Sequence, residues 1–230
     1  MALSGTYLWG PNLGQIFLNA YSRIGVKRTE IVPQHLDDAL YEANAQQAEW
    51  SNSGIMLWLQ DLQTFNMVAG QATYSVPATT VMITDLFIGV GPDPLHPNNR
   101  LITPFSRTDY ASLSNPLSPG FPTSYFFLKN VTPTITFYPV PDNNNTYTVN
   151  FWRYRILEDA VAAQGGNPDI QYLFTDAYTA GMAHRLSRHY APPLEQIRKA
   201  DYDTAFQLAM KQNSENVPLY ISVGLSGFYR

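Results

Sequence analysis

The chain has 230 residues, a formal net charge of −4, 45% hydrophobic residues and 14% charged residues. This composition excludes a disordered chain, and the acidic balance excludes a global basic field that would hold nucleic acid. The absence of cysteine excludes disulfide bonds, thiolate catalysis and cysteine-ligated zinc. No apolar run approaches the length of a membrane span and no leader peptide is evident, so we expect a soluble, unexported protein with no membrane partner.

The first part of the chain, Leu13–Trp58, is predicted to be helical. Thr29 is the expected cap of the second helix, with Pro33 in its first turn, and Ser51–Gly54 should interrupt that helix. The short apolar run Ile55–Leu59 fits either a helix or a strand. Two apolar stripes recur at the period of one helix face: Leu13, Ile16, Phe17, Ala20 and Ile24, then Leu36, Ala39, Leu40, Ala43, Gln47 and Trp50.

The middle of the chain is predicted to be β-rich. Ala72–Val76 and Val81–Val90 are expected strands bounded by Pro and Gly. Residues 91–123 contain seven of the 17 prolines and little periodicity, which predicts a long loop. An antiparallel meander is then expected from Ser124–Leu128, Thr134–Tyr138 and Tyr147–Tyr154. In its last strand both faces carry aromatic residues, so both are expected to be covered: Tyr147, Val149 and Phe151 on one, Trp152 and Tyr154 on the other.

The last regular part, Gln171–Gln212, is predicted to form two helices separated by Pro192-Pro193. The expected inward residues are Leu173, Phe174, Ala177, Tyr178, Gly181 and Met182 in the first helix, and Leu194, Ile197, Ala205, Leu208 and Ala209 in the second. Neither helical part is long enough to be stable alone, so we expect them to pack together.

The sequence therefore predicts an α+β fold in which N- and C-terminal segments form an α-helical bundle with an inserted antiparallel β domain. The expected boundaries are residues 1–69 and 158–216 for the two parts of the bundle, and 70–157 for the β domain. Residues 217–230 are expected to form a separate C-terminal docking arm.

No constellation of catalytic residue types is found. None of the four histidines has a metal-binding spacing, no Gly-rich phosphate loop is present, and Glu158 and Asp159 are sequence neighbours that would not face one gap. We therefore predict no catalytic residues, no metal site and no cofactor.

Four basic residues, Arg185, Arg188, Arg198 and Lys199, cluster around the Pro192-Pro193 turn. They could contact the phosphates of DNA or an acidic protein surface. A helix C-terminus favoured by positive charge, together with a solvated face, is the favoured interpretation.

Four sequence segments resemble those of a known family: Gly70–Pro77, Pro122–Tyr125, Ile135–Asp142 and Tyr147–Tyr154. In this order, with helices before and after, the chain resembles the head-to-tail adaptor proteins of short-tailed bacteriophages, also called head-completion or tail tubular proteins. The resemblance extends from the first helix to about Gln212.

The resemblance implies a structural virion protein at the head-tail junction that is assembled in the host cytoplasm. It implies a homo-oligomeric ring of about twelve copies, closed through a heterologous interface. The implied partners are the portal protein, a downstream tail nozzle or tail tube protein, and double-stranded DNA, which would pass through the channel without sequence recognition. Two alternatives remain, a carbohydrate-binding tail component and a cell-wall-hydrolysing one.

The end of the chain is apolar and follows Pro218. Its residues are expected to form a docking arm that leaves the subunit and lies along the portal, by adding backbone hydrogen bonds and filling pockets. A tail folded back on its own subunit is the alternative. The portal-docking residues are Leu219, Tyr220, Ile221, Val223, Leu225, Phe228, Tyr229 and Arg230.

Overall fold

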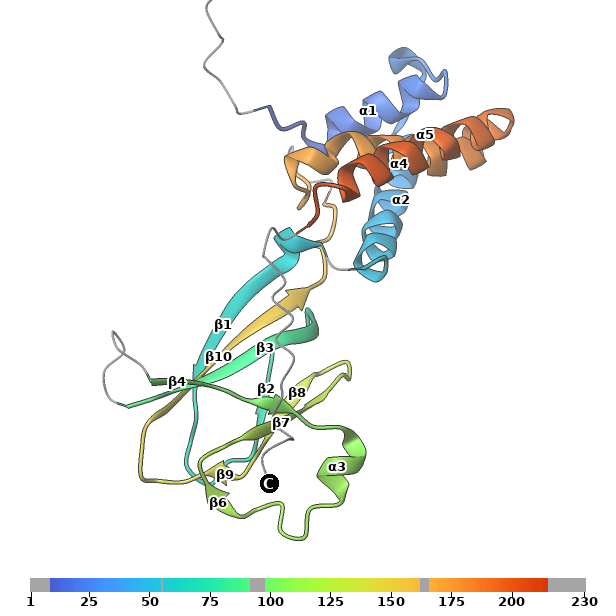
Figure 1. Ribbon diagram of the computed structural model, residues 1–230. Helices are drawn as coiled ribbons and strands as arrows, with labels where there is room; N and C mark the ends of the chain where they lie inside the picture. The colour runs from blue at the N-terminus through green and yellow to red at the C-terminus, as the bar shows by residue number, and fades with distance from the viewer. Residues whose placement is uncertain (1–8, 55, 92–97, 162–165, 215–230) are drawn as a thin grey trace, which may run out of the picture.

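A computed structural model describes residues 9–54, 56–91, 98–161 and 166–214. It has two lobes, a helical lobe and a β lobe, joined by the ends of long strands (Figure 1). The helical lobe contains α1 (Leu13–Arg23), α2 (Pro33–Asn52), α4 (Thr175–Tyr190) and α5 (Glu195–Met210). The expected α+β fold, with a helical bundle built from both ends of the chain and an inserted β domain, is confirmed.

In the described residues, the β lobe contains ten strands and the short helix α3 (Arg107–Ala111). The strands are β1 (Gln60–Asn66), β2 (Thr73–Ser75), β3 (Thr80–Val90), β4 (Asn98–Leu101), β5 (Thr103–Pro104), β6 (Pro119–Gly120), β7 (Ser124–Leu128), β8 (Thr134–Tyr138), β9 (Val140–Pro141) and β10 (Tyr147–Arg155). They form one four-stranded sheet in the order β1-β10-β3-β4, a second in the order β2-β8-β7-β5, and the small pair β6-β9.

Helix α1 forms as the sequence predicts. The Asn12 side chain accepts a hydrogen bond from the backbone N–H of Gln15 at 2.8 Å, and the Gln15 side chain accepts one from the Asn12 N–H at 3.2 Å. This reciprocal capping satisfies two amides that the first turn leaves free. The predicted apolar stripe of α1 is buried, and Gly25 follows the helix with a positive φ of 88°.

Helix α2 begins later than expected. Its N-cap is Val32 and its first residue is Pro33, whose missing N–H costs nothing at that position. Thr29 instead lies in a separate 3₁₀ turn, Arg28–Glu30, so its assignment as the cap is wrong. The helix ends at Asn52, close to the predicted interruption, and Gly54 follows with a φ of 129°.

Helix α4 is the centre of the helical lobe, because α1, α2 and α5 all pack against it. Gly181 allows the close approach of α2, since a Cβ atom there would lie 2.3 Å from Nε2 of Gln46. That Gln46 amide donates a hydrogen bond to the Tyr178 carbonyl at 3.2 Å. The expected packing of the two helical parts of the chain is thus observed.

Aromatic side chains complete this core around Trp50. Its indole N–H donates to the hydroxyl of Tyr202 at 2.8 Å, and its ring lies 5.9 Å from Phe174 and 5.4 Å from Phe206. These contacts bring Tyr202 and Phe206 of α5 toward the core.

Two of the five predicted inward residues of this region, Ile197 and Leu208, therefore point outward, whereas Ala205 packs against the core. Ile197 is 56% exposed and Leu208 is 66% exposed, although Ala209 is buried as expected. Leu173, which lies in the 3₁₀ turn before α4, is also about half exposed. On a 3.6-residue period, a face that contains Tyr202 and Phe206 turns Ile197 and Leu208 outward.

Three predictions about the β lobe are wrong. Residues 60–66 were placed in the helical part, but they form β1, which pairs with β10. The expected meander does not form, because β7 and β8 pair with each other whereas β10 lies in the other sheet between β1 and β3. The predicted long loop over residues 91–123 contains β4, β5, α3 and β6 among its described residues.

The outer face of β10 is also open, contrary to expectation. Trp152 is 42% exposed beside Leu62 of β1. Further along this face, the Thr64 hydroxyl donates to the Asn150 side chain at 2.9 Å. Tyr154 lies on the same face of β10, as the sequence predicts, but it is buried in the core of the helical lobe.

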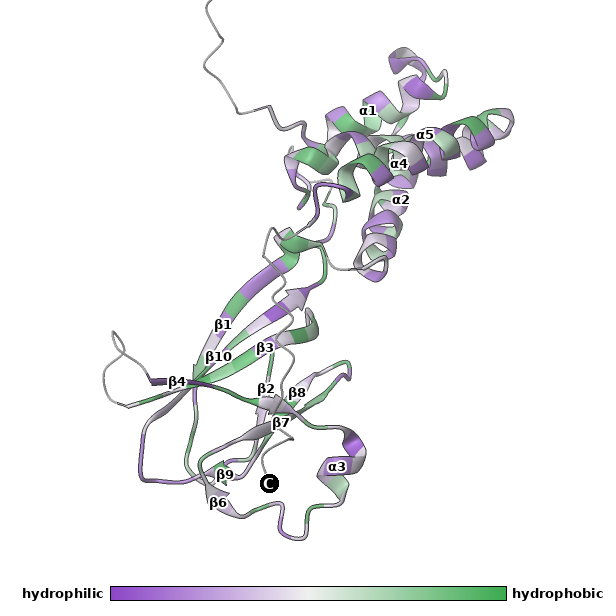
Figure 2. Ribbon diagram, in the orientation of Figure 1, coloured by the Kyte–Doolittle hydropathy of each residue, from purple (hydrophilic) through white to green (hydrophobic). Residues whose placement is uncertain are grey.

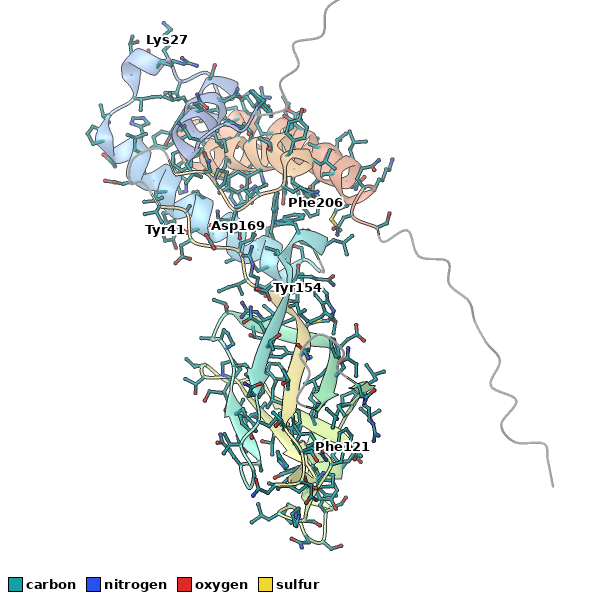
Figure 3. All side chains as sticks on the ribbon, turned by 90° about the vertical axis from the view of Figure 1, so that its left-hand side faces the viewer. Lys27, Tyr41, Phe121, Tyr154, Asp169 and Phe206 are labelled. Carbon is teal, nitrogen blue, oxygen red and sulfur yellow. The ribbon has the colours of Figure 1, made fainter. Side chains whose placement is uncertain are left out.

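The two lobes meet at the end of β10 (Figure 3 shows Tyr154 at this point). The Tyr154 hydroxyl donates to the Gly54 carbonyl at 2.6 Å and accepts from the Met56 N–H. Next to it, the buried guanidinium of Arg153 donates two hydrogen bonds to Asp61, at 2.6 and 2.9 Å. Arg153 also donates to the hydroxyls of Thr79 and Thr80.

Replacing Phe174 with Ala should lower the free energy of unfolding by about 3–5 kcal/mol, because Phe174 is 1% exposed and contacts Trp50 and Trp58. The adjacent Leu173→Ala variant is the control and should cost less than about 1 kcal/mol. Urea denaturation of both variants measures the difference. Equal losses would show that the Trp50 cluster is not the main packing contact of this region.

Acid should weaken the junction through Asp61. Hydrogen bonds from Arg153 hold the pKa of Asp61 below its usual value, so this pair stabilises the fold above the unfolded-state pKa and loses that contribution as pH falls through the folded-state pKa. In Asp61→Asn, the free energy of unfolding should therefore fall less between about pH 5 and pH 2 than in the unmodified chain. Denaturation at each pH measures the two slopes, and parallel slopes would contradict the assignment.

Candidate functional site

The predicted basic cluster lies where α4 and α5 meet α2, and most of its charges are used inside the subunit. The Arg185 side chain, only 16% exposed, contacts Glu42 at 3.0 Å and also pairs with Glu49. His189 contacts the other oxygen of Glu42 at 3.2 Å. Arg185 therefore holds α4 to α2, and an external phosphate would have to displace two carboxylates.

The other members of the cluster lie nearer the solvent. Arg188 pairs with Glu195 at 3.2 Å and Arg198 pairs with Asp201 at 2.8 Å. Lys199 is exposed, and the described residues provide no carboxylate partner for it. The contact with DNA or an acidic partner stays a prediction, and Lys199 and the half-exposed Arg188 are the members most able to make it.

His184 lies beneath this cluster and is buried. Its burial and the nearby Arg188 guanidinium lower the pKa of His184, which favours the neutral imidazole. The ring stacks on Tyr202 with centroids 6.1 Å apart. These contacts make His184 a packing residue between α4 and α5.

No group of three His, Asp or Glu side chains that could hold a metal ion occurs in the described part of the chain. Within the same residues, no helix is long and apolar enough to cross a membrane. The predicted portal-docking residues, Leu219 to Arg230, lie outside the described residues.

The sequence did not predict the outer face of α5. Ile197 and Leu208 are 11 positions apart, which places them on one side of the helix, with Asp201 and Thr204 between them. All four residues are exposed. We call this surface the α5 outer face. The spacing of the two aliphatic residues predicts a core position, whereas the contact of Tyr202 with Trp50 turns them outward.

Helix α2 also exposes apolar residues, and they lie on two sides of the helix, because Leu36 and Tyr41 are five positions apart. Tyr41 is 74% exposed, and Val32 and Leu36 are each about half exposed. Figure 3 shows Tyr41 at one side of the helical lobe. The lobe therefore presents apolar groups on two different surfaces, although its own core is filled.

Replacing Arg185 with Ala should leave one carboxylate oxygen of Glu42, whose side chain is only 12% exposed, without its guanidinium partner. We expect a loss of about 1–3 kcal/mol in the free energy of unfolding, because a nearly buried acceptor loses its hydrogen bond. Arg198→Ala is the control, since its ion pair is more exposed and is worth less than about 1 kcal/mol. Guanidinium denaturation compares the two, and an equal effect would show that Arg185 does not join α4 to α2.

A protein-family model described as SU10 adaptor protein matches residues 15–221. The matched residues include both lobes and all four sequence segments on which the resemblance to phage adaptors rests. No match was found among curated proteins. The matching family consists of structural phage proteins and is not a class of enzymes. The chain therefore belongs to the SU10 adaptor protein family and is a structural adaptor of a bacteriophage virion.

Proposed function

We propose that the protein assembles into a ring of about twelve copies that joins the portal to the tail and surrounds the path of double-stranded DNA. The observation that carries the proposal is the pair of apolar surfaces on the helical lobe, on α2 and on the α5 outer face. Family membership as a phage adaptor supports the same role.

A closed ring of identical subunits requires two different surfaces that meet between neighbours. In this proposal, the α5 outer face of one copy packs on the surface around Tyr41 of the next. Ile197 and Leu208 would bury apolar area, and Asp201 between them would face the neighbour's polar rim. Apolar residues that serve no purpose within a filled core are typical of such an obligate interface.

The elongated subunit suits a connection between two partners (Figure 1). The chain leaves the last helix in the helical lobe, so residues 217–230 could reach the portal from there. The far end of the β lobe, which includes the turn after β9, would then face the downstream tail nozzle or tail tube protein. Particles of this kind would form in the host cytoplasm and place the protein at the head-tail junction.

A conduit should let DNA slide and should not hold it. Strong binding to phosphates needs Lys and Arg side chains that release counterions. Here the formal charge is −4, and Arg185, Arg188 and Arg198 already have carboxylate partners. The proposed channel therefore carries DNA without reading its sequence.

The ring is tested with Ile197→Asp, mixed with the portal protein of the same phage and viewed by electron microscopy. The unmodified chain should add a ring of about twelve copies to the portal, whereas Ile197→Asp should remain monomeric because a charge would enter the apolar interface. Its unfolding midpoint should not change, since Ile197 is exposed in the subunit.

Val131→Asp is the matched control, because Val131 is 92% exposed in the β lobe and lies outside both proposed surfaces. It should form rings as the unmodified chain does. Normal rings from Ile197→Asp would exclude the α5 outer face as the interface. Failure of the unmodified chain to bind the portal would contradict the proposed function itself.

A further inference from the structure

Strand β1 is the edge of its sheet, and its outer side has no partner among the described residues. The sheet order is β1-β10-β3-β4, so only one side of β1 is paired. The Met67 N–H donates to the Tyr147 carbonyl at 2.9 Å, which continues the β1–β10 register. Because pairing directions alternate in an antiparallel ladder, the N–H and C=O groups of Leu62, Thr64 and Asn66 point away from β10.

A pocket of about 400 Å³ lies along the same edge. It opens between β1 and the segment around β2, which is itself the edge of the second sheet. A strand added to β1 would therefore place alternate side chains into this pocket. Its lining includes Phe65, Tyr74, Val76, Pro77 and Phe151.

The described chain ends beside the start of this edge. The Asn213 side chain accepts a hydrogen bond from the Leu57 N–H at 2.9 Å, and Leu57–Leu59 leads directly into β1. Sixteen residues, 215–230, follow the described part. Extended, they could span about 53 Å, whereas the seven residues of β1 need only about 23 Å.

The composition of these last residues suits a strand. Leu219, Tyr220, Ile221 and Val223 have high β-propensity, and Arg230 is the only charged residue after Pro218. Alone, such a segment and a seven-residue free edge are both aggregation hazards. Pairing them with each other removes both hazards at once.

We propose that, in the free subunit, the chain's own C-terminal segment pairs in parallel with the free edge of β1 and inserts side chains into the adjacent pocket. The segment starts near Leu57 and runs in the direction of β1, which makes the pairing parallel. This arrangement concerns the subunit before assembly and does not depend on the portal role. It would store the segment until a partner competes for it.

Residue-resolved hydrogen exchange of the full chain and of a chain truncated after Asn216 tests the proposal. In the full chain, the amides of Leu62, Thr64 and Asn66 should exchange at least about tenfold more slowly than in the truncated chain. The amides of Gln63 and Phe65, which face β10, and those of α4 should be equally protected in both, which also verifies that the truncated chain folds.

A second variant keeps the full length. Thr64→Pro removes an amide that faces the free edge and leaves the backbone hydrogen bonds to β10 in place, as proline is tolerated on edge strands, although it also removes the hydrogen bond from the Thr64 hydroxyl to Asn150. It should release the segment, so that the amides of Ile221 and Val223 exchange faster by a similar factor.

Equal exchange at Leu62, Thr64 and Asn66 in the full and truncated chains would overturn the proposal. Protection that rises with protein concentration, together with the mass of a dimer, would also overturn it, because a second copy would then occupy the edge. Neither hydrogen-exchange experiment includes the portal protein, so the outcome of this test is independent of the ring experiment.

Discussion

The structure depends on β10, because this single strand contributes to both cores. Phe151 is buried in the β lobe, and Tyr154, only three positions later, is buried in the helical lobe. The two residues are an odd number of positions apart, so they point to opposite faces of β10. Separating the lobes would expose one of these side chains and break the hydrogen bonds of Tyr154 with Gly54 and Met56. The subunit is therefore expected to transmit force between its ends as one body.

Arg153 fixes the relative positions of β10, β1 and the start of β3 at this junction. A buried guanidinium is costly unless its donors are satisfied, and here Asp61, Thr79 and Thr80 satisfy them. The same arrangement explains why β1 was not predicted. Asp61 and Gln63 share the side of the strand that carries Phe65, and Figure 2 shows hydrophobic and hydrophilic residues interspersed along β1. A strand that turns a carboxylate toward a buried partner does not display an alternating apolar pattern.

The amphipathic helices could be predicted, whereas the long-range pairings could not. The stripe of α1 and the buried face of α4 follow from helical periodicity alone. The phase of α5 depends instead on the Trp50–Tyr202 hydrogen bond, and the place of β10 depends on partners far away in the sequence. The candidate site follows the same rule. The sequence located the basic cluster, but the carboxylates that neutralise Arg185 come from α2, more than one hundred residues away.

In a structural adaptor, the residues that indicate function lie in different places from those of an enzyme. In an enzyme, a buried polar constellation points to function, whereas here the buried polar groups, Arg153 and Gln46, hold elements together. Among the described residues, the groups with no contact to satisfy them inside the subunit include apolar side chains on α5 and α2 and the outer backbone groups of β1. Exposed apolar area and a free strand edge both cost solubility. Two surfaces on the helical lobe suit neighbours in a ring, and an edge on the β lobe suits an extended segment, so assembly and storage of the C-terminal segment need not compete for the same atoms.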